Sequence, residues 1–134
     1  MKKFAAFMLA LILLVSFCGC KEQKEPSNKL FETEKIKCIT VTSLNDTSSY
    51  VFRGSKIDIL VSHLSNLNLS TDFDENPTEQ NGTSWAISIE YQNGKFVKLH
   101  RVGNEFIRRK NGVWYKMDSA EANYFESLLQ VYGD

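Results

Sequence analysis

The sequence has little of what catalytic and disulfide-stabilised proteins require. Its 134 residues include 3 cysteines, 2 histidines and 2 prolines, and the formal net charge is zero. It contains no Gly-x-Ser-x-Gly nucleophile motif, no His-based metal-binding motif and no Gly-rich phosphate-binding loop. The signatures of common hydrolases, metalloenzymes and nucleotide-binding enzymes are therefore missing. From the sequence we expect neither an enzyme nor a cofactor, and no metal site.

Only one long hydrophobic run occurs, and it lies at the N-terminus. Lys2 and Lys3 precede residues 4–17, which are almost all apolar, and a short group of small residues follows. A charged start, an apolar stretch and small residues, in this order, are typical of a secretory signal peptide. The run is shorter than the ~20 residues that a membrane-spanning helix needs. The sequence therefore predicts export.

The signal-like segment ends in Phe17-Cys18-Gly19-Cys20. This tetrapeptide resembles the bacterial lipobox, in which an apolar residue and two small residues precede an invariant cysteine. The resemblance implies cleavage before Cys20, a lipid on the Cys20 thiol, and anchoring at the extracytoplasmic face of the cell membrane. Phe17 and Cys18 are mild departures, because Leu is usual at the first position and Ala or Ser at the second. The alternatives are an ordinary cleaved signal and an uncleaved anchor.

The chain as a whole resembles small lipoproteins of Gram-positive bacteria. We expect residues 1–19 to be the signal peptide, residues 20–34 a lipid-anchored polar tether, and residues 35–134 a single extracytoplasmic domain. Cleavage would remove two lysines and leave 16 − 2 = 14 basic residues against 16 acidic ones. Since nucleic-acid-binding domains are usually basic, this balance argues against a nucleic-acid partner. We expect a monomer that contacts the membrane through Cys20.

One cysteine is left for the mature domain. With Cys18 cleaved off and Cys20 lipidated, Cys38 has no partner for an intrachain disulfide. It lies in a β-branched run that predicts a strand, where a cysteine usually behaves as a small buried hydrophobe. A catalytic thiol would need a histidine or a cation nearby. His63 and His100 are expected to be polar, outward-facing residues, so neither is predicted to activate Cys38.

Hydrophobic patterning predicts an α+β fold. Alternating apolar and polar residues indicate strands, and apolar residues at helical spacing indicate two helices. Strands are expected at residues 35–42, 49–53 and 85–91, around Val97 and Leu99, and at residues 106–109 and 113–117. Helices are expected at residues 56–67 and 119–132. The predicted fold is an antiparallel sheet, made of an N-terminal hairpin and a four-strand meander, with two helices packed on one face.

The first turn of the meander is marked by Asn93-Gly94. A two-residue loop would place polar residues of one strand opposite apolar residues of the next. A three-residue loop with a left-handed Gly94 instead pairs Ile89 with Val97 and Ile87 with Leu99. Because cross-strand pairs share a face, the second register is the better one.

The helix ends carry local signals as well. Ser55 with Asp58, and Asp118 with Glu121, have the spacing of a capping box. Gly133 suits the position just after the C-terminus of a helix. These patterns predict the beginnings of both helices and the end of the second.

Residues 70–83 form a long, polar and acidic loop. Asp72, Asp74 and Asn76 match the first three ligand positions of a calcium-binding EF-hand loop. Pro77 and Thr83, however, stand where a glycine and a glutamate are needed. The paired helices of an EF-hand are also missing. We interpret the segment as a solvated loop, and long loops often carry function. Its candidate partner residues are Asp72, Asp74 and Glu75.

Residues 95–116 are basic, with seven lysines and arginines against Glu105 alone. The simpler interpretation is that these residues form a solvent-exposed face of the sheet without a binding role. The functional interpretation is a patch for an anionic partner such as teichoic acid, lipid headgroups or an acidic protein surface. The candidate residues are Arg101, Arg108, Arg109, Lys110 and Trp114, with Tyr115 as an alternative aromatic contact.

These observations favour a lipid-anchored binding or accessory module at the cell envelope. The first alternative is a small inhibitor that blocks a secreted enzyme with a loop, for which a protruding, ordered loop at residues 70–83 would be evidence. The second is a hydrolase with an unrecognised site, for which convergence of Cys38 with a histidine would be evidence. The sequence identifies neither the partner nor the ligand.

Overall fold

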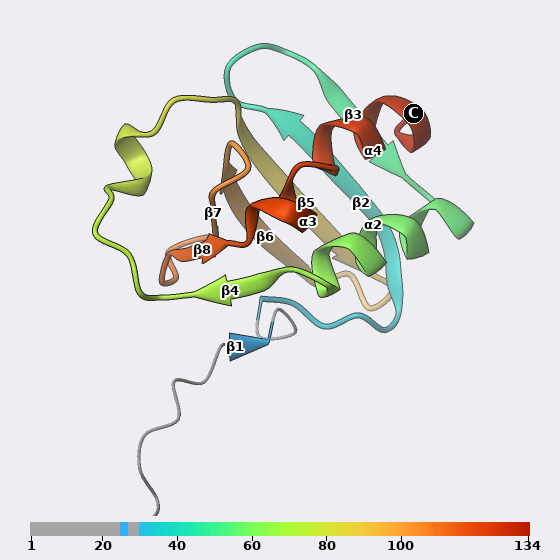
Figure 1. The fold of residues 1–134 in the computed structure, drawn as a ribbon. Helices are drawn as coiled ribbons and strands as arrows, with labels where there is room; N and C mark the ends of the chain where they lie inside the picture. The colour runs from blue at the N-terminus through green and yellow to red at the C-terminus, as the bar shows by residue number, and fades with distance from the viewer. Residues whose placement is uncertain (1–24, 27–29) are drawn as a thin grey trace, which may run out of the picture.

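The computed structural model describes residues 25–26 and 30–134. Cys20 and the rest of the lipobox-like segment lie outside the described residues. The strands are β1 (Glu25–Pro26), β2 (Ile36–Ser43), β3 (Ser49–Phe52), β4 (Asn68–Ser70), β5 (Ser84–Tyr91), β6 (Phe96–Val102), β7 (Phe106–Arg109) and β8 (Tyr115–Met117). The helices are α2 (Ser55–Ser65), the 3-10 helix η2 (Pro77–Glu79), α3 (Ser119–Ala122) and α4 (Phe125–Tyr132) (Figure 1).

The strands form one antiparallel sheet in the order β1-β4-β8-β7-β6-β5-β2-β3. The meander β5–β8 lies in the middle, and the hairpin β2–β3 extends it beside β5. The α-helices lie on one side of the sheet, with α3 in front of β5 and β6 in Figure 1 and α2 and α4 toward β2 and β3. The expected α+β fold is therefore confirmed. The pairing of β4 with β8 is an addition that the sequence patterns did not predict.

The register of the first meander hairpin is the predicted one. Ile89 pairs with Val97, and Ile87 pairs with Leu99. Gly94 has φ 83°, a left-handed conformation that favours glycine. Apolar side chains of the two strands consequently share the face that the helices cover.

The hydrophobic core lies between this face and the helices. Leu60 and Leu64 of α2, and Phe125 and Leu129 of α4, are almost completely buried. They pack on strand residues that are also fully buried, which are Ile39, Val41, Phe52, Ile87 and Ile89.

The folded domain begins earlier than residue 35. Leu30 is 1% exposed and Phe31 is 3% exposed, and both belong to the core. Two residues of the segment that we expected to be a tether thus belong to the core. The sequence patterns did not predict the burial of these two apolar residues, because the residues around them are polar.

The helix ends correct two local expectations and confirm two others. No side-chain cap forms at the start of α2, where Gly54 with φ 58° precedes the first turn. Asp118 does cap α3 by accepting a hydrogen bond from the Ala120 amide at 3.2 Å. The expected helix over residues 119–132 is divided into α3 and α4. Gly133 directly follows α4, as predicted, and it is extended, with φ −74° and ψ 138°.

Candidate functional site

The sheet has one face covered by helices and one open face. Cross-strand partners lie on the same face, so the register of β2, β5, β6 and β7 shows which side chains the open face carries. We define the open face by Thr40, Thr42, Ala86, Ser88, Lys98, His100 and Arg108 of these strands, with Trp114 beside them. The residues on β2 and β5 are short, and the lysine, histidine and arginine lie on the adjoining strands β6 and β7.

Arg108, Trp114 and His100 form a stacked cluster on the open face. The guanidinium carbon of Arg108 lies 4.6 Å from the centre of the Trp114 ring. The rings of Trp114 and His100 are 5.2 Å apart between centres and inclined at 53°. A cation over an indole is attracted by the ring electrons. The cluster therefore holds an arginine in one position before any ligand arrives.

The histidine of this cluster is uncharged at neutral pH. Partial burial lowers the pKa of His100, and the charge of Arg108 lowers it further. Arg108 consequently supplies the positive charge of the cluster. A guanidinium beside an aromatic ring suits a carboxylate or phosphate, because its planar array of donors matches these anions.

Arg109 and Lys110 lie at a different place, the end of the sheet where the β5–β6 turn is found. A shallow groove of about 670 Å³ runs there between the segment that precedes β2 and the β5–β6 hairpin. A second hollow of about 290 Å³ adjoins it. Phe96 is 58% exposed between them. We define the hairpin-end patch by Lys35, Lys95, Phe96, Lys98, Arg109 and Lys110, which line the two hollows.

The acidic loop is attached to the sheet at two points. The Phe73 ring packs on Phe106, with 5.1 Å between ring centres. Glu75 pairs with Lys116 of β8 at 2.5 Å, and this contact lowers the pKa of Glu75. Asp72 and Asp74 are exposed. Across the described part of the chain, no group of three or more His, Cys, Asp or Glu residues is placed to hold a metal ion.

Arg101 does not belong to a partner surface, because its side chain is completely buried. The register that pairs Ile87 with Leu99 also pairs Trp85 with Arg101, and so directs Arg101 toward the helices. The guanidinium donates to the Gly103 carbonyl, the Asn104 side chain and the Ala122 carbonyl, at 3.0, 3.1 and 2.7 Å. Its carbon lies 4.0 Å from the centre of the Phe125 ring. Burial lowers the pKa of Arg101 to about 9, so it remains charged at neutral pH.

His63 is also in the core, which corrects the expectation of a solvated helix residue. It is 8% exposed and stacks on Phe125, with 6.0 Å between ring centres. Burial lowers its pKa to about 4, and the charge of Arg101 contributes. His63 is consequently neutral, and it lies on the covered side of the sheet.

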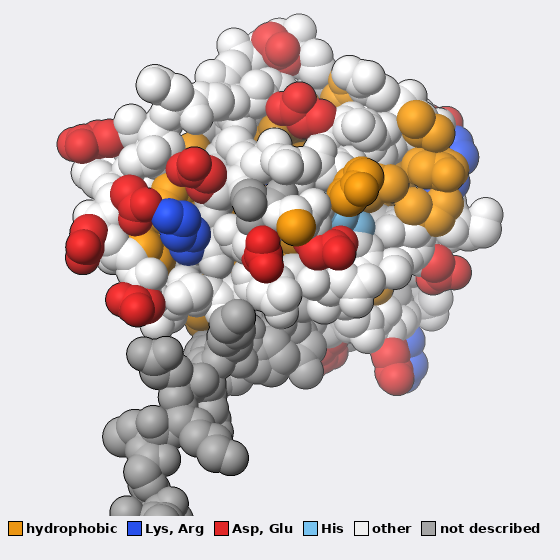
Figure 2. All heavy atoms as spheres, in the orientation of Figure 1, with side chains coloured by type: hydrophobic (Ala, Val, Ile, Leu, Met, Phe, Trp, Pro, Cys, Tyr) orange, Lys and Arg blue, Asp and Glu red, His pale blue; other side chains and the backbone are white. Residues whose placement is uncertain are grey.

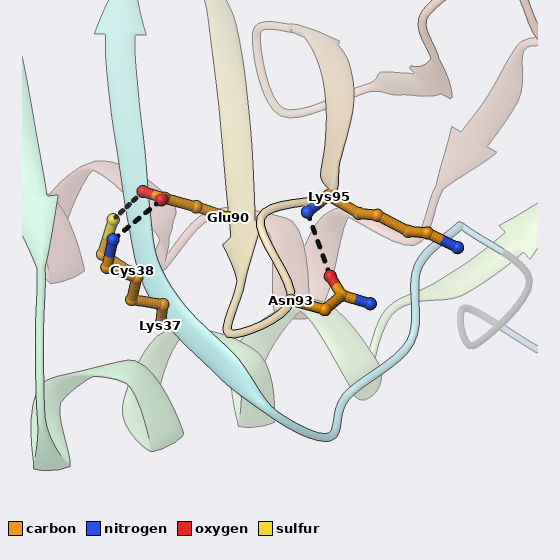
Figure 3. A network of polar contacts seen from close by, with 5 residues as sticks. All are labelled: Lys37, Cys38, Glu90, Asn93 and Lys95. Atoms are coloured by element: carbon orange, nitrogen blue, oxygen red, sulfur yellow. Dashed lines mark hydrogen bonds and ion pairs between the residues drawn. The ribbon is translucent and has the colours of Figure 1, made fainter.

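Cys38 lies on the open side and contacts a carboxylate rather than a histidine. Figure 3 shows that Cys38 and Lys37 both approach Glu90, with Sγ and Nζ at 3.3 and 3.0 Å from its carboxylate oxygens. Burial and the Glu90 carboxylate raise the pKa of the Cys38 thiol. His63 is across the sheet, and His100 lies opposite Ala86 rather than opposite Glu90. The convergence that would favour a hydrolase is therefore not observed.

The predicted partner residues thus fall into separate places. Arg108 and Trp114 come together, Arg109 and Lys110 lie at the hairpin end, and Arg101 is buried. Sequence reasoning missed Phe96, although the predicted register places it opposite Glu90 on the open side of the sheet. It also missed the contact of His100 with Trp114.

Comparison of the chain with protein-family models, with curated proteins and with solved structures finds no match in any of the three. Within the residues that the structure describes, no helix has both the length and the hydrophobicity to cross a membrane. The geometry of the site is therefore the basis for assigning a function.

Proposed function

We propose that the chain is a lipid-anchored extracytoplasmic lipoprotein that acts as a binding or accessory module at the cell envelope. Cys20 carries the lipid in this proposal, and the domain after it presents a surface to an anionic partner. The observation that supports the binding role is the cluster of Arg108, Trp114 and His100 on the open face. Its partner is an acidic protein surface or an anionic envelope polymer.

Three properties of the cluster favour binding over a merely solvated face. Stacking on Trp114 restricts the Arg108 side chain, so less conformational entropy is lost when an anion binds. The indole adds apolar contact area beside the charge. Short side chains at Ala86 and Ser88 leave the neighbouring strands accessible to an extended partner. Tyr115, by contrast, packs against the core.

The binding role is tested by crosslinking and pull-down from the native envelope. We expect the wild type to retain a partner that the double variant Arg108→Gln, Trp114→Leu loses. Lys56→Gln is the matched control, because it removes one positive charge from α2 on the other side of the sheet. If the double variant retains the same partners as the wild type, the open face is not the binding surface.

The anchor is tested separately by metabolic labelling with palmitate. Label should vanish in Cys20→Ala and persist in Cys18→Ala, because only Cys20 follows the predicted cleavage site. Persistence of label in Cys20→Ala would contradict the anchor and the localisation that depends on it.

A second candidate function, inhibition of a secreted enzyme, is favoured by the loop at residues 70–83. The loop extends from the side of the domain at the left of Figure 1, and it contains η2 near its tip. The Phe73–Phe106 and Glu75–Lys116 contacts hold its base. A rigid projecting loop can enter an enzyme cleft with little loss of entropy. If the wild type captures a secreted enzyme and a variant lacking residues 76–81 does not, inhibition is favoured over the first function.

A further inference from the structure

The hairpin-end patch combines an exposed aromatic ring with unpaired positive charge. Phe96 is 58% exposed at the beginning of β6. Lys95 and Lys98 flank it in the sequence, and Lys35, Arg109 and Lys110 reach it from two other segments. Within residues 25–26 and 30–134, none of these five cations forms an ion pair. Figure 3 shows the Lys95 side chain extending away from the turn, on the other side from Glu90.

The patch differs in charge from the rest of the domain. The patch has five cations, and Glu32 and Glu34 lie beside the same groove, so the local net charge is 5 − 2 = +3. Residues 30–134 contain 11 basic and 14 acidic residues, a net charge of 11 − 14 = −3. The remainder of the domain therefore carries −3 − 3 = −6. Figure 2 shows carboxylates distributed over the side that the helices cover, with few cations among them.

The patch borders the segment that leads into β2. Leu30 and Phe31 are buried, and Phe31, Glu32 and Glu34 line the groove. In Figure 1 the segment before β2 and the β5–β6 turn lie at the same, lower end of the molecule. From Cys20 to Glu25, the first residue of β1, the chain has five residues, which span at most about 18 Å when fully extended. A lipid on Cys20 would therefore hold this end of the domain near the membrane surface.

We infer that the hairpin-end patch contacts anionic phospholipid headgroups, with Phe96 inserted into the interface. This inference rests on the proposed lipid anchor at Cys20. Basic residues near a membrane are attracted to anionic lipids, and an aromatic side chain is favoured at the level of the headgroups. Because the anchor already confines the domain, its effective concentration at the surface is high, and a weak contact is sufficient. The patch shares Lys98 with the open face, and it holds the domain in one orientation with Arg108 and Trp114 free to bind a partner.

The test uses the full lipidated chain in vesicles and a fluorophore that reports its surroundings. The dye is attached through Asn93→Cys, at the tip of the β5–β6 turn, and in a control through Asp58→Cys on α2. In vesicles of phosphatidylcholine with phosphatidylglycerol, we expect a blue-shifted and more intense emission at position 93 only. In phosphatidylcholine alone, or at high salt, this shift should be lost because the attraction is electrostatic.

Two variants identify the residues responsible. Phe96→Ser and the double variant Lys95→Gln, Lys98→Gln should each abolish the shift, and circular dichroism should be unchanged because these side chains are exposed. Equal emission at position 93 in both vesicle types would overturn the inference. So would a shift produced by soluble teichoic acid and not by the vesicles.

A separate measurement shows whether Cys20 carries a lipid, independently of the contact made by the patch. Flotation of the protein with phosphatidylcholine vesicles reports the lipid on Cys20, whereas the dye reports the patch. A protein that floats without any dye response retains the anchor and contradicts only the second membrane contact.

Discussion

Arg101 is a charged residue at a position of β6 whose side chain faces the core. The alternation of inward- and outward-facing residues along the strand determines this direction. The charge of arginine predicts an exposed residue, whereas the register opposite Trp85 predicts a buried one. The register prevails because the carbonyls of Gly103 and Ala122 and the Asn104 side chain accept its hydrogen bonds. A buried charge is tolerated when such partners surround it. Arg101 thereby ties the β6–β7 turn and the end of α3 to the sheet.

Arg101→Met should lower the free energy of unfolding by about 2–4 kcal/mol, because it leaves buried carbonyls without donors. The measurement is urea unfolding at neutral pH. Arg109→Met is the matched control, since Arg109 is exposed on the neighbouring strand and should change stability by less than about 0.5 kcal/mol. Equal effects of the two substitutions would show that the Arg101 contacts do not stabilise the fold.

His63 makes stability depend on pH. Its pKa is about 4 in the folded chain against 6.5 as the ordinary value. The unfolded state therefore binds more protons between these values, and stability is fully present above pH 6.5 and declines as the pH falls toward 4. The shift corresponds to a loss of up to about 3 kcal/mol across this window.

The variant His63→Phe keeps a ring against Phe125 and removes the titration. We expect its free energy of unfolding, measured in urea from pH 7.5 to 4.5, to fall less steeply than that of the wild type. Carboxylates contribute equally to both proteins and cancel in the comparison. Parallel pH profiles would mean that His63 is not the group responsible.

At the scale of elements, the meander and both ends of the closing helical segment were predictable, and the break within that segment was not. Asn93-Gly94 and the alternation of β5 are local signals, and the expected register formed. The division between α3 and α4 has a distant cause, because the Ala122 carbonyl accepts a hydrogen bond from Arg101, 21 residues away in the sequence. β4 has three residues with one buried side chain, Leu69, which is too short a pattern to recognise.

Gly133 is required for space rather than for backbone freedom. A Cβ atom at this position would lie 2.5 Å from the Leu129 carbonyl oxygen and 2.8 Å from the Tyr50 side chain. The chain beyond α4 approaches β3 here, where Asp134 and Val51 exchange backbone hydrogen bonds at 3.1 and 3.2 Å. A side chain at position 133 would therefore separate the end of α4 from the edge of the sheet.

Gly133→Ala should cost about 1–3 kcal/mol, as overpacking usually does. Faster hydrogen exchange at the Val51 amide would locate the damage. Val131→Ala, two residues earlier and 69% exposed, is the control and should leave both measurements nearly unchanged. Unaltered exchange at Val51 in Gly133→Ala would contradict the steric explanation.

At the scale of the whole molecule, the sequence predicted that residues 95–116 are basic. It did not predict that these residues lie on separate surfaces. Arg108, Arg109 and Lys110 are consecutive, yet the strand alternation sends Arg108 to the open face and Arg109 to the groove. Their companions come from other segments, such as Trp114 and Lys35. Which residues share a patch depends on the packing of strands that are distant in sequence, and no local pattern contains this information.

The extent of the domain leads to the last prediction. Leu30 and Phe31 precede the first long strand and are 1% and 3% exposed, so the chain before β2 closes the core. Full burial of each such side chain contributes about 1.5–3 kcal/mol. A protein that begins at residue 35 should therefore be about 3–6 kcal/mol less stable in urea than one that begins at residue 30. Equal stability of the two proteins would show that Leu30 and Phe31 do not stabilise the core.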